Sequence, residues 1–393
     1  MTPPWLVVFR KEVLENSRER RALSMALLLG PLIGPVMFAI MLGFTIAKQL
    51  HDSEATLRLP VAGAERAPNL VLFLKQQGVE ILPAPADPEQ AIRDQVFPVI
   101  LRIPVDFGEQ WRSGEPAVVE LLSDQSRENT RTPYERTRAL IQGYISQTGA
   151  LRLLARGVAP VVAAPAAIAE RDLSTPQSRA GILLAVLPYF LVLAVFVGGM
   201  YLAIDVTAGE RERQSLESLL LNPVSRDQIV VGKLLAISVY AMLSAAISIT
   251  AFSLCLRFVP TADLGFVLRL PLRAALLIWL IIVPLAPLSA ALQTLTAARA
   301  KTFREAQSYL QFMMLVPLVP SLMQMINPGK PAAWMYQVPL FNQSVLIGEL
   351  SRGESVAMAQ LALCWGSTLA AALLLSLAAV AAYRRERVAF GSS

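Results

Sequence analysis

The sequence contains few of the residues that enzymes use for catalysis or metal binding. Among its 393 residues are one histidine, His51, and two cysteines, Cys255 and Cys364. Zinc sites need several His, Cys or carboxylate ligands, so a lone histidine predicts a solvated surface residue rather than a metal site. Both cysteines lie in apolar segments, which excludes a disulfide framework.

A phosphate-binding loop is also missing. No segment has the spacing G-x-x-x-x-G-K-[ST] that holds the phosphates of ATP, and "NPGKPAA" from Asn327 lacks both the spacing and the hydroxyl. We therefore expect no ATP site and no cofactor in this chain. The apolar segments hold no charged dyad for intramembrane proteolysis. Ionisable groups gather at the ends of these segments, which disfavours a self-contained, ion-coupled transporter.

Charge is scarce, whereas apolar residues are abundant. Charged residues make up 16% of the chain and hydrophobic residues 54%, and the mean hydropathy is +0.51. This composition predicts an α-helical integral membrane protein. A transmembrane helix needs roughly 20 apolar residues, and six segments are candidates. They are residues 22–47, 181–204, 234–256, 274–298, 310–326 and 356–383.

The candidate segment 310–326 is the weakest of the six. It is short, contains Gln311 and Gln324, and is interrupted by Pro317 and Pro320. Proline removes a backbone donor and breaks helices, and a broken helix in a membrane needs protein partners for its freed polar groups. The region 310–354 is thus either a full span or a re-entrant segment.

Basic residues indicate the orientation, because short cytoplasmic segments carry the excess of Lys and Arg. With the N-terminus inside, the inner segments hold Arg10, Lys11, Arg18, Arg20, Arg21, Arg211, Arg213, Arg226, Lys233, Arg299, Lys301, Arg304, Arg384, Arg385 and Arg387. The short outer segments hold only Arg257, Arg269, Arg273, Lys330 and Arg352. Both termini, residues 1–21 and 384–393, are therefore expected in the cytoplasm. The net charge of +6 then reflects topology, not nucleic-acid binding.

The polar region 49–179 lies between the first and second predicted spans, which places it outside the cytoplasm. Strand-like runs "LRLPVAG", "GVEIL", "VFPVILRI" and "AVVELL" alternate with helical stretches, and this alternation predicts an α/β domain. Apolar residues at helical spacing over 134–155 add a longer helix. The Ala/Pro-rich "VAPVVAAPAAIA" that follows is expected to be a linker back to the membrane domain, residues 181–383.

One stretch between two spans is densely charged: "GERERQSLESLLLNPVSRDQIVVGK", from Gly209. Thr207 and Glu210 have the spacing of a capping box, so we expect a helix over 207–222 that begins at Thr207 and ends before Pro223. Its apolar face would consist of Leu216, Leu219 and Leu220. The helix either lies among the lipid headgroups or binds a cytoplasmic partner. Ser225 and Gln228 form a second capping box, which would open the third span.

The run "LPYFLVLAVFVGGMYLAIDVTAGERERQSLESLLLNPVSRDQIVVGKLLA" resembles the span, loop and span of type-two ABC exporter permeases. Its closest similarity is to the NatB-like sodium-extrusion permeases. "IPVDFGEQWRSGEPAVVELLSDQS" and "RLLARGVAP" are similar to the same family, and the likeness covers nearly the whole chain. It implies a subunit of the bacterial inner membrane that pairs with a second copy or a sister permease. Two separate ATPase subunits would bind ATP and Mg.

The resemblance also implies roles for single residues. The ATPase would contact Glu210, Arg211, Glu212, Arg213 and Glu217, while Leu216, Leu219 and Leu220 pack against it or the N-terminal helix. That helix, roughly 5–21, places Trp5, Leu6, Phe9 and Val13 on one side, as an interfacial helix does; it is either an anchor or part of the coupling. The cargo stays open among sodium, drug, lipid and peptide.

Polar residues near the inner ends of the spans have two interpretations. They are Asp205, Gln293, Thr294, Glu305, Gln307 and Gln311. Their oxygens suit a hard cation on a substrate pathway, or they serve helix ends and interhelical hydrogen bonds. Gly30 and Gly34 form a GxxxG pattern that permits close helix packing or a dimer seam.

The main alternative function is a membrane receptor or scaffold with an extracytoplasmic sensing domain. It is disfavoured because the inner loops and the C-terminal tail are too short for a signalling domain.

Overall fold

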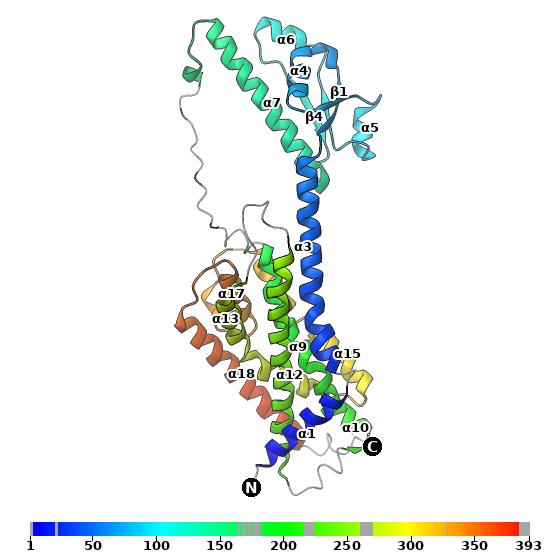
Figure 1. Ribbon diagram of the computed structural model, residues 1–393, viewed down its shortest axis with the longest axis vertical. Helices are drawn as coiled ribbons and strands as arrows, with labels where there is room; N and C mark the ends of the chain where they lie inside the picture. Colours follow the sequence, from blue (N-terminus) through cyan, green and yellow to red (C-terminus); the bar gives the residue numbers. More distant parts are fainter. Residues whose placement is uncertain are drawn as a thin grey trace. The chain divides into compact units, whose positions relative to one another are not determined.

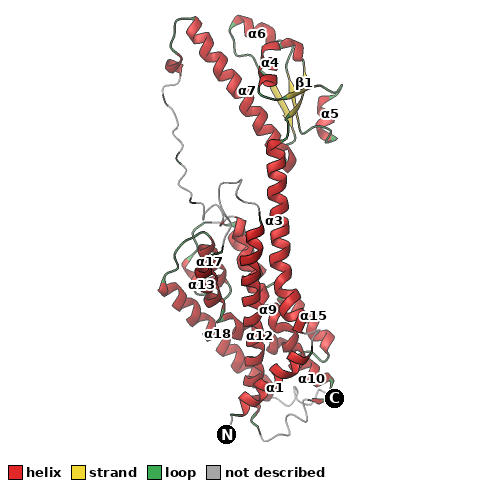
Figure 2. Ribbon diagram, viewed as in Figure 1, coloured by secondary structure: helices red, strands yellow, loops and turns green. Residues whose placement is uncertain are grey.

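The computed structural model describes residues 3–19, 23–163, 166, 171, 175, 181, 183–215, 224–259, 270–327 and 329–384. The chain divides into two compact units, coloured along the sequence in Figure 1. Unit 1 comprises Met1–Ile46 and Leu173–Ser393, and unit 2 comprises Ala47–Asp172. Among the described residues, the β-sheet belongs to unit 2 and unit 1 is helical (Figure 2).

Five helical segments of the described chain are long and apolar enough to cross a membrane. They are Ala26–Lys48, Leu184–Glu212, Arg226–Phe258, Leu272–Ala297 and Met358–Arg384, and they coincide with five of the six expected spans. In their most apolar parts the middle three are 67%, 61% and 56% buried, whereas the first and last are 22% buried. The middle three therefore form the interior of unit 1.

The helices within these segments have the following bounds. They are α3 (Gly30–Glu54), α9 (Leu187–Ile204), α12 (Arg226–Cys255), α13 (Leu272–Ile282), α14 (Leu285–Ala297) and α18 (Met358–Arg384), with the N-terminal helix α1 at Pro4–Arg18. Helix α12 begins directly after Ser225, as the sequence predicts, although the Ser225 side chain makes no capping hydrogen bond.

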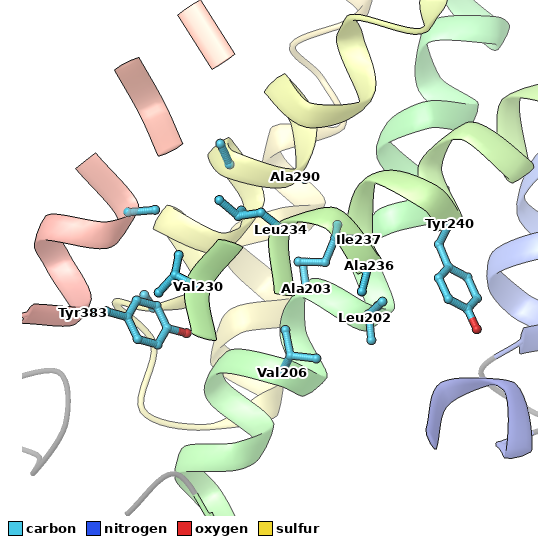
Figure 3. Close-up of a cluster of buried hydrophobic side chains, with 13 residues drawn as sticks. Leu202, Ala203, Val206, Val230, Leu234, Ala236, Ile237, Tyr240, Ala290 and Tyr383 are labelled. Carbon is cyan, nitrogen blue, oxygen red and sulfur yellow. The ribbon is translucent and has the colours of Figure 1, made fainter. Parts of the chain in front are cut away.

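Small side chains let the central helices of unit 1 pack closely. Figure 3 shows Leu202 and Ala203 of α9, Ala236 and Ile237 of α12, and Ala290 of α14 in one buried cluster. A Cβ atom built on Gly198 of α9 would lie 2.2 Å from the Cβ of Ser244 in α12. On the same principle, Gly34 of α3 packs against the ring of Phe190 in α9, where a Cβ would lie 2.7 Å from a ring carbon. Gly34 thus serves packing within the chain.

The remaining expected span, residues 310–326, is not one continuous helix. Helix α15 (Phe303–Met313) and helix α16 (Leu318–Ile326) have 11 and 9 residues, and each is shorter than the roughly 20 residues that a span needs. The break lies before Pro317, which cannot donate the hydrogen bond that a continuing helix requires. The helix is thus interrupted at the position that its prolines predict.

The chain after α16 returns into the body of unit 1. The 3-10 turn η8 (Ala333–Tyr336) leads to α17 (Phe341–Ser351), most of whose residues are buried. Asn342 Nδ2 of α17 donates to Ser367 Oγ of α18 at 3.0 Å, and Gln343 Nε2 donates to Thr368 Oγ1 at 2.9 Å. These bonds satisfy polar groups in an otherwise apolar interior.

Unit 2 has the expected α/β layer. Its strands are β1 (Arg58–Ala62), β2 (Glu80–Pro83), β3 (Val99–Arg102) and β4 (Glu120–Ser123). The sheet order is β2-β1-β3-β4, in which β4 alone is antiparallel to its neighbour. The helices are α4 (Pro68–Gln76), α5 (Pro88–Arg93), α6 (Phe107–Ser113) and α7 (Glu128–Ala155). The expected linker covers residues 158–169. Its first part is described and contains the 3-10 turn η3 (Pro160–Ala163), whereas 164, 165 and 167–169 lie outside the described residues.

Candidate functional site

The charged stretch after α9 continues that helix instead of starting a new one. A π-turn, η5 (Asp205–Gly209), leads into the single turn α10 (Glu210–Glu212). The expected helix start at Thr207 is wrong. Its hydroxyl donates to the carbonyl of Ala203 and is buried, and a bond to the residue four positions earlier forms inside a helix, not at its cap.

The helix then ends at a turn in which Gln214 has φ = +58°. The predicted apolar residues Leu216, Leu219 and Leu220, together with Glu217, lie outside the described residues. Their apolar face therefore stays a prediction.

Glu210 forms a buried ion pair with Lys233 of α12. The two residues are 5% and 0% exposed, and Lys233 Nζ contacts Glu210 Oε2 and donates to the carbonyl of Val206 at 2.7 Å. Removing two charges from water is costly unless each keeps good partners. This pair therefore ties the end of α9 to α12 and strongly resists separation.

Helix α1 adds a second pair of charges at the same place. Lys11 Nζ lies 3.3 Å from Glu12 Oε1 and 3.8 Å from Glu210 Oε1. Glu12 is 3% exposed, and its burial raises the pKa of its carboxyl group, with Glu210 adding to the rise and Lys233 and Lys11 opposing it. We call Lys11, Glu12, Glu210 and Lys233 the charge cluster. It joins α1, α10 and α12.

Phe9 and Val13 of α1 pack against the core of unit 1, as its apolar side predicts, but the most buried residues of α1 are not all apolar. Val8, Glu12 and Asn16 are its buried residues, so α1 turns a partly polar face inward instead of burying only apolar side chains. A Cβ on Gly232 of α12 would lie 2.7 Å from the carbonyl oxygen of Trp5. Helix α1 thus docks directly on the backbone of α12.

Arg211 and Glu212 fix α10 to the loop between α14 and α15. Arg211 Nη1 and Nη2 donate to the carbonyls of Ala300 and Ala298 at 2.8 and 2.9 Å. Glu212 Oε2 accepts from the backbone N–H of Phe303, the first residue of α15, at 2.7 Å. A guanidinium fork that holds two carbonyls imposes a fixed geometry. We call these three bonds the arginine staple.

The last of the four adjacent charges closes back on its own helix. Arg213 Nη2 lies 2.9 Å from Asp205 Oδ1. Nearby, Arg226 Nη1 of α12 donates to the carbonyl of Arg384 at the end of α18 at 3.1 Å, and Arg384 Nε donates to Asp227 Oδ1 at 2.9 Å. Basic side chains commonly satisfy the last carbonyls of a helix in this way. The charges at this end of unit 1 therefore connect α9, α12, α14, α15 and α18.

The six candidate pathway residues do not form one group. Gln293 and Thr294 are buried in α14, and Gln293 Nε2 donates to the carbonyl of Phe196 at 2.7 Å. Glu305 accepts from the backbone N–H of Lys301 at 2.7 Å at the start of α15. Asp205 is paired with Arg213 as above, and Gln307 and Gln311 are exposed. The described part of the chain holds no group of three His, Cys, Asp or Glu residues placed to bind a metal ion.

Sequence reasoning missed the partners of these charges. Lys233 was counted as one more basic residue at the start of a span, yet it is among the most buried side chains. Glu12 was not singled out. Lys233 had one available signal, because it is a lone charge in an apolar stretch, and membrane helices retain such a charge only with a partner. Glu12 lies in a charged run and had no such signal.

Comparison with known proteins finds one matching family and one similar protein. A family model described as "ABC-2 family transporter protein" matches residues 25–381. The protein described as "ABC transporter permease protein NatB" from Bacillus subtilis (strain 168) is 24% identical over 355 residues, which cover 88% of this chain and 89% of that protein.

Proposed function

The chain belongs to the ABC-2 family of transporter proteins, and from this premise we propose that it is the permease subunit of an exporter driven by separate ATPase subunits. The observation that carries the proposal is the joining of α1, α9, α12 and α14 at one end of unit 1 by the charge cluster and the arginine staple. A displacement of α10 by the ATPase would move these helices together. The reason is that the Glu210–Lys233 pair is buried and Arg211 holds two carbonyls at once.

The four adjacent charges then have two kinds of role. Glu210 is buried and Arg211 is half-buried, and both are bonded within the chain, so they would transmit force instead of contacting the partner. Glu212 and Arg213 are exposed, and we assign them, with Glu217, to the polar rim of the ATPase contact. Leu216, Leu219 and Leu220 would supply its apolar centre, as interfaces generally combine an apolar core with a polar rim.

The assembled exporter would contain further subunits. The ATPase subunits would bind ATP and Mg, and a second copy or a sister permease would complete the membrane channel. Unit 2 would lie on the extracytoplasmic side of a bacterial inner membrane. The resemblance to NatB-like permeases makes the sodium ion the first cargo to test.

We expect the purified chain to hydrolyse no ATP by itself. The reason is the missing phosphate loop, without which the nucleotide has no backbone cradle. The measurement is phosphate release by the purified chain in lipid nanodiscs, compared with the chain purified together with its ATPase. Vanadate-sensitive turnover by a preparation free of other subunits would disprove the assignment.

The orientation gives a second expected result. In a variant with Cys255 and Cys364 replaced by Ala, a cysteine introduced as Ser113→Cys in unit 2 should react with an impermeant maleimide in intact cells. A cysteine introduced as Ser215→Cys, beside α10, should react only after permeabilisation. Basic residues dominate the segments on the α10 side, which predicts that this side is cytoplasmic. The reverse labelling pattern would overturn the topology.

A further inference from the structure

Unit 2 contains a cavity that the transport proposal does not use. Its volume is about 190 Å³, and it lies between α4, α6 and α7. Phe107, Trp111 and Tyr144 form its aromatic wall, and Arg66, Arg112 and Asn69 supply polar groups. No Asp or Glu occurs among the described residues that line it. We call it the aromatic cavity.

The aromatic wall is a stack of three rings. The centre of the Trp111 ring lies 5.6 Å from the centre of the Phe107 ring, and the angle between the two ring planes is 20°. It lies 5.9 Å from the centre of the Tyr144 ring, with an angle of 16° between the planes. Phe107 is buried, whereas Trp111 and Tyr144 are only partly buried. Partly exposed aromatic side chains that line a cavity offer apolar contact to another ring.

Two arginines hold this wall and its rim in place without a ligand. Arg152 donates to the carbonyl of Trp111 at 2.8 Å and places its guanidinium carbon 4.1 Å from the centre of the Trp111 ring. Arg66 Nη1 donates to the carbonyl of Ile103 at 2.8 Å. Groups already fixed in position lose little conformational entropy when a ligand binds, which increases affinity.

Arg112 differs from these two arginines. It is exposed at the cavity and forms no ion pair or hydrogen bond with the described residues. Arg66 is partly neutralised by Glu65, whose Oε1 lies 3.5 Å from Arg66 Nε. Arg112 is therefore the cation available to an incoming anion, and guanidinium groups bind carboxylates with two parallel hydrogen bonds.

We propose that the aromatic cavity binds a small aromatic carboxylate. A cavity of about 150 Å³ holds benzene in another protein, so this volume suits one ring that carries a carboxylate. The ring would contact Trp111 and Tyr144, and the carboxylate would contact Arg112. This binding goes beyond the proposed transport function and does not depend on it.

The test uses the full chain in nanodiscs, labelled with 5-fluorotryptophan and titrated with benzoate. Of the five tryptophans, Trp111 alone lies in unit 2, and Trp111→Phe assigns its fluorine signal. We expect the Trp111 signal to shift to saturation, while Trp5, Trp279, Trp334 and Trp365 stay unchanged. The four unmoved signals separate binding from partitioning of benzoate into lipid.

Charge variants then identify the anion contact. Arg112→Ala should weaken benzoate binding about tenfold or more, as expected for the loss of a hydrogen bond to a charged group. Lys75→Ala removes an exposed charge of unit 2 away from the cavity and should leave the affinity unchanged. The proposal is overturned by a Trp111 signal that does not respond, by all five signals drifting together without saturation, or by equal affinity in the Arg112→Ala variant.

Discussion

Lys233→Met is expected to lower the free energy of unfolding of unit 1 by about 3–5 kcal/mol, the usual cost of removing one partner from a buried ion pair. Glu210 would then be buried without its close cation, beside the buried carboxyl group of Glu12. Lys11 cannot replace Lys233, because its side chain is 40% exposed and its Nζ lies 3.8 Å from Glu210. We expect a large loss of folded protein when detergent-solubilised samples are heated and assayed by size-exclusion chromatography.

A double variant shows whether the lost stability comes from the unpaired charge of Glu210 or from the changed packing of residue 233. Glu210→Met combined with Lys233→Met leaves Lys11 and Glu12 as a neutral pair, so much of the lost stability should return. Arg58→Met breaks the exposed Arg58–Glu80 pair of unit 2, whose side chains are 72% and 46% exposed. Exposed pairs contribute about 0–1 kcal/mol, so this variant should behave like the unmodified chain. A single Lys233→Met variant as stable as that control would contradict the assignment of the charge cluster.

Gly198→Val is expected to separate α9 from α12 and to prevent normal folding of unit 1. A Cβ at this position would lie 2.2 Å from Ser244 Cβ and 3.1 Å from the carbonyl oxygen of Tyr240. Neither atom is the free end of a flexible side chain, so the helices themselves must move. The shift would also disturb the buried bond from Ser244 Oγ to the carbonyl of Ala194, 2.7 Å long. Overpacking of this kind costs about 1–3 kcal/mol or more.

A matched glycine provides the control for this steric effect. Gly366 lies in α18, where a Cβ would meet nothing within 4 Å. Gly366→Ala should be neutral or slightly stabilising, because alanine favours a helix by up to about 1 kcal/mol over glycine. Equal thermal stability of the Gly198→Val and Gly366→Ala variants would show that α9 and α12 do not pack as described.

The sequence predicted those parts of the fold that depend on local composition. Long uncharged runs identified five spans, and alternating strand and helix patterns identified the α/β layer of unit 2. Pro317 signalled the break between α15 and α16, although not the return of α17 into the interior. That return depends on bonds such as Asn342 to Ser367, whose partners are distant in the sequence.

The candidate site was predicted less completely, because the partners of its charged residues depend on how the helices pack. The stretch Glu210–Arg213 was recognised as unusual, but alternating charges do not reveal which elements they contact. Thr207 fits a capping box by spacing alone, whereas its buried hydroxyl bonds to Ala203 within a continuing helix. The partner of Glu210, Lys233, is visible only once α9 and α12 lie side by side.

A separate ATPase is expected to dock at the α10 end of this permease. The most direct test is to purify the tagged chain from native membranes and identify the bound proteins by mass spectrometry. The matched variants are Leu219→Ala with Leu220→Ala, in the predicted docking segment, and Leu373→Ala with Leu374→Ala, an exposed leucine pair of α18. Truncating central apolar contacts of an interface mainly shortens residence of the partner.

We predict that an ABC ATPase is recovered with the unmodified chain and with the α18 variant, and is lost from the Leu219/Leu220 variant although that variant is still expressed and inserted. Recovery of a signalling protein instead of an ATPase would favour the receptor alternative. An ATPase that stays bound to the Leu219/Leu220 variant would contradict docking through this segment.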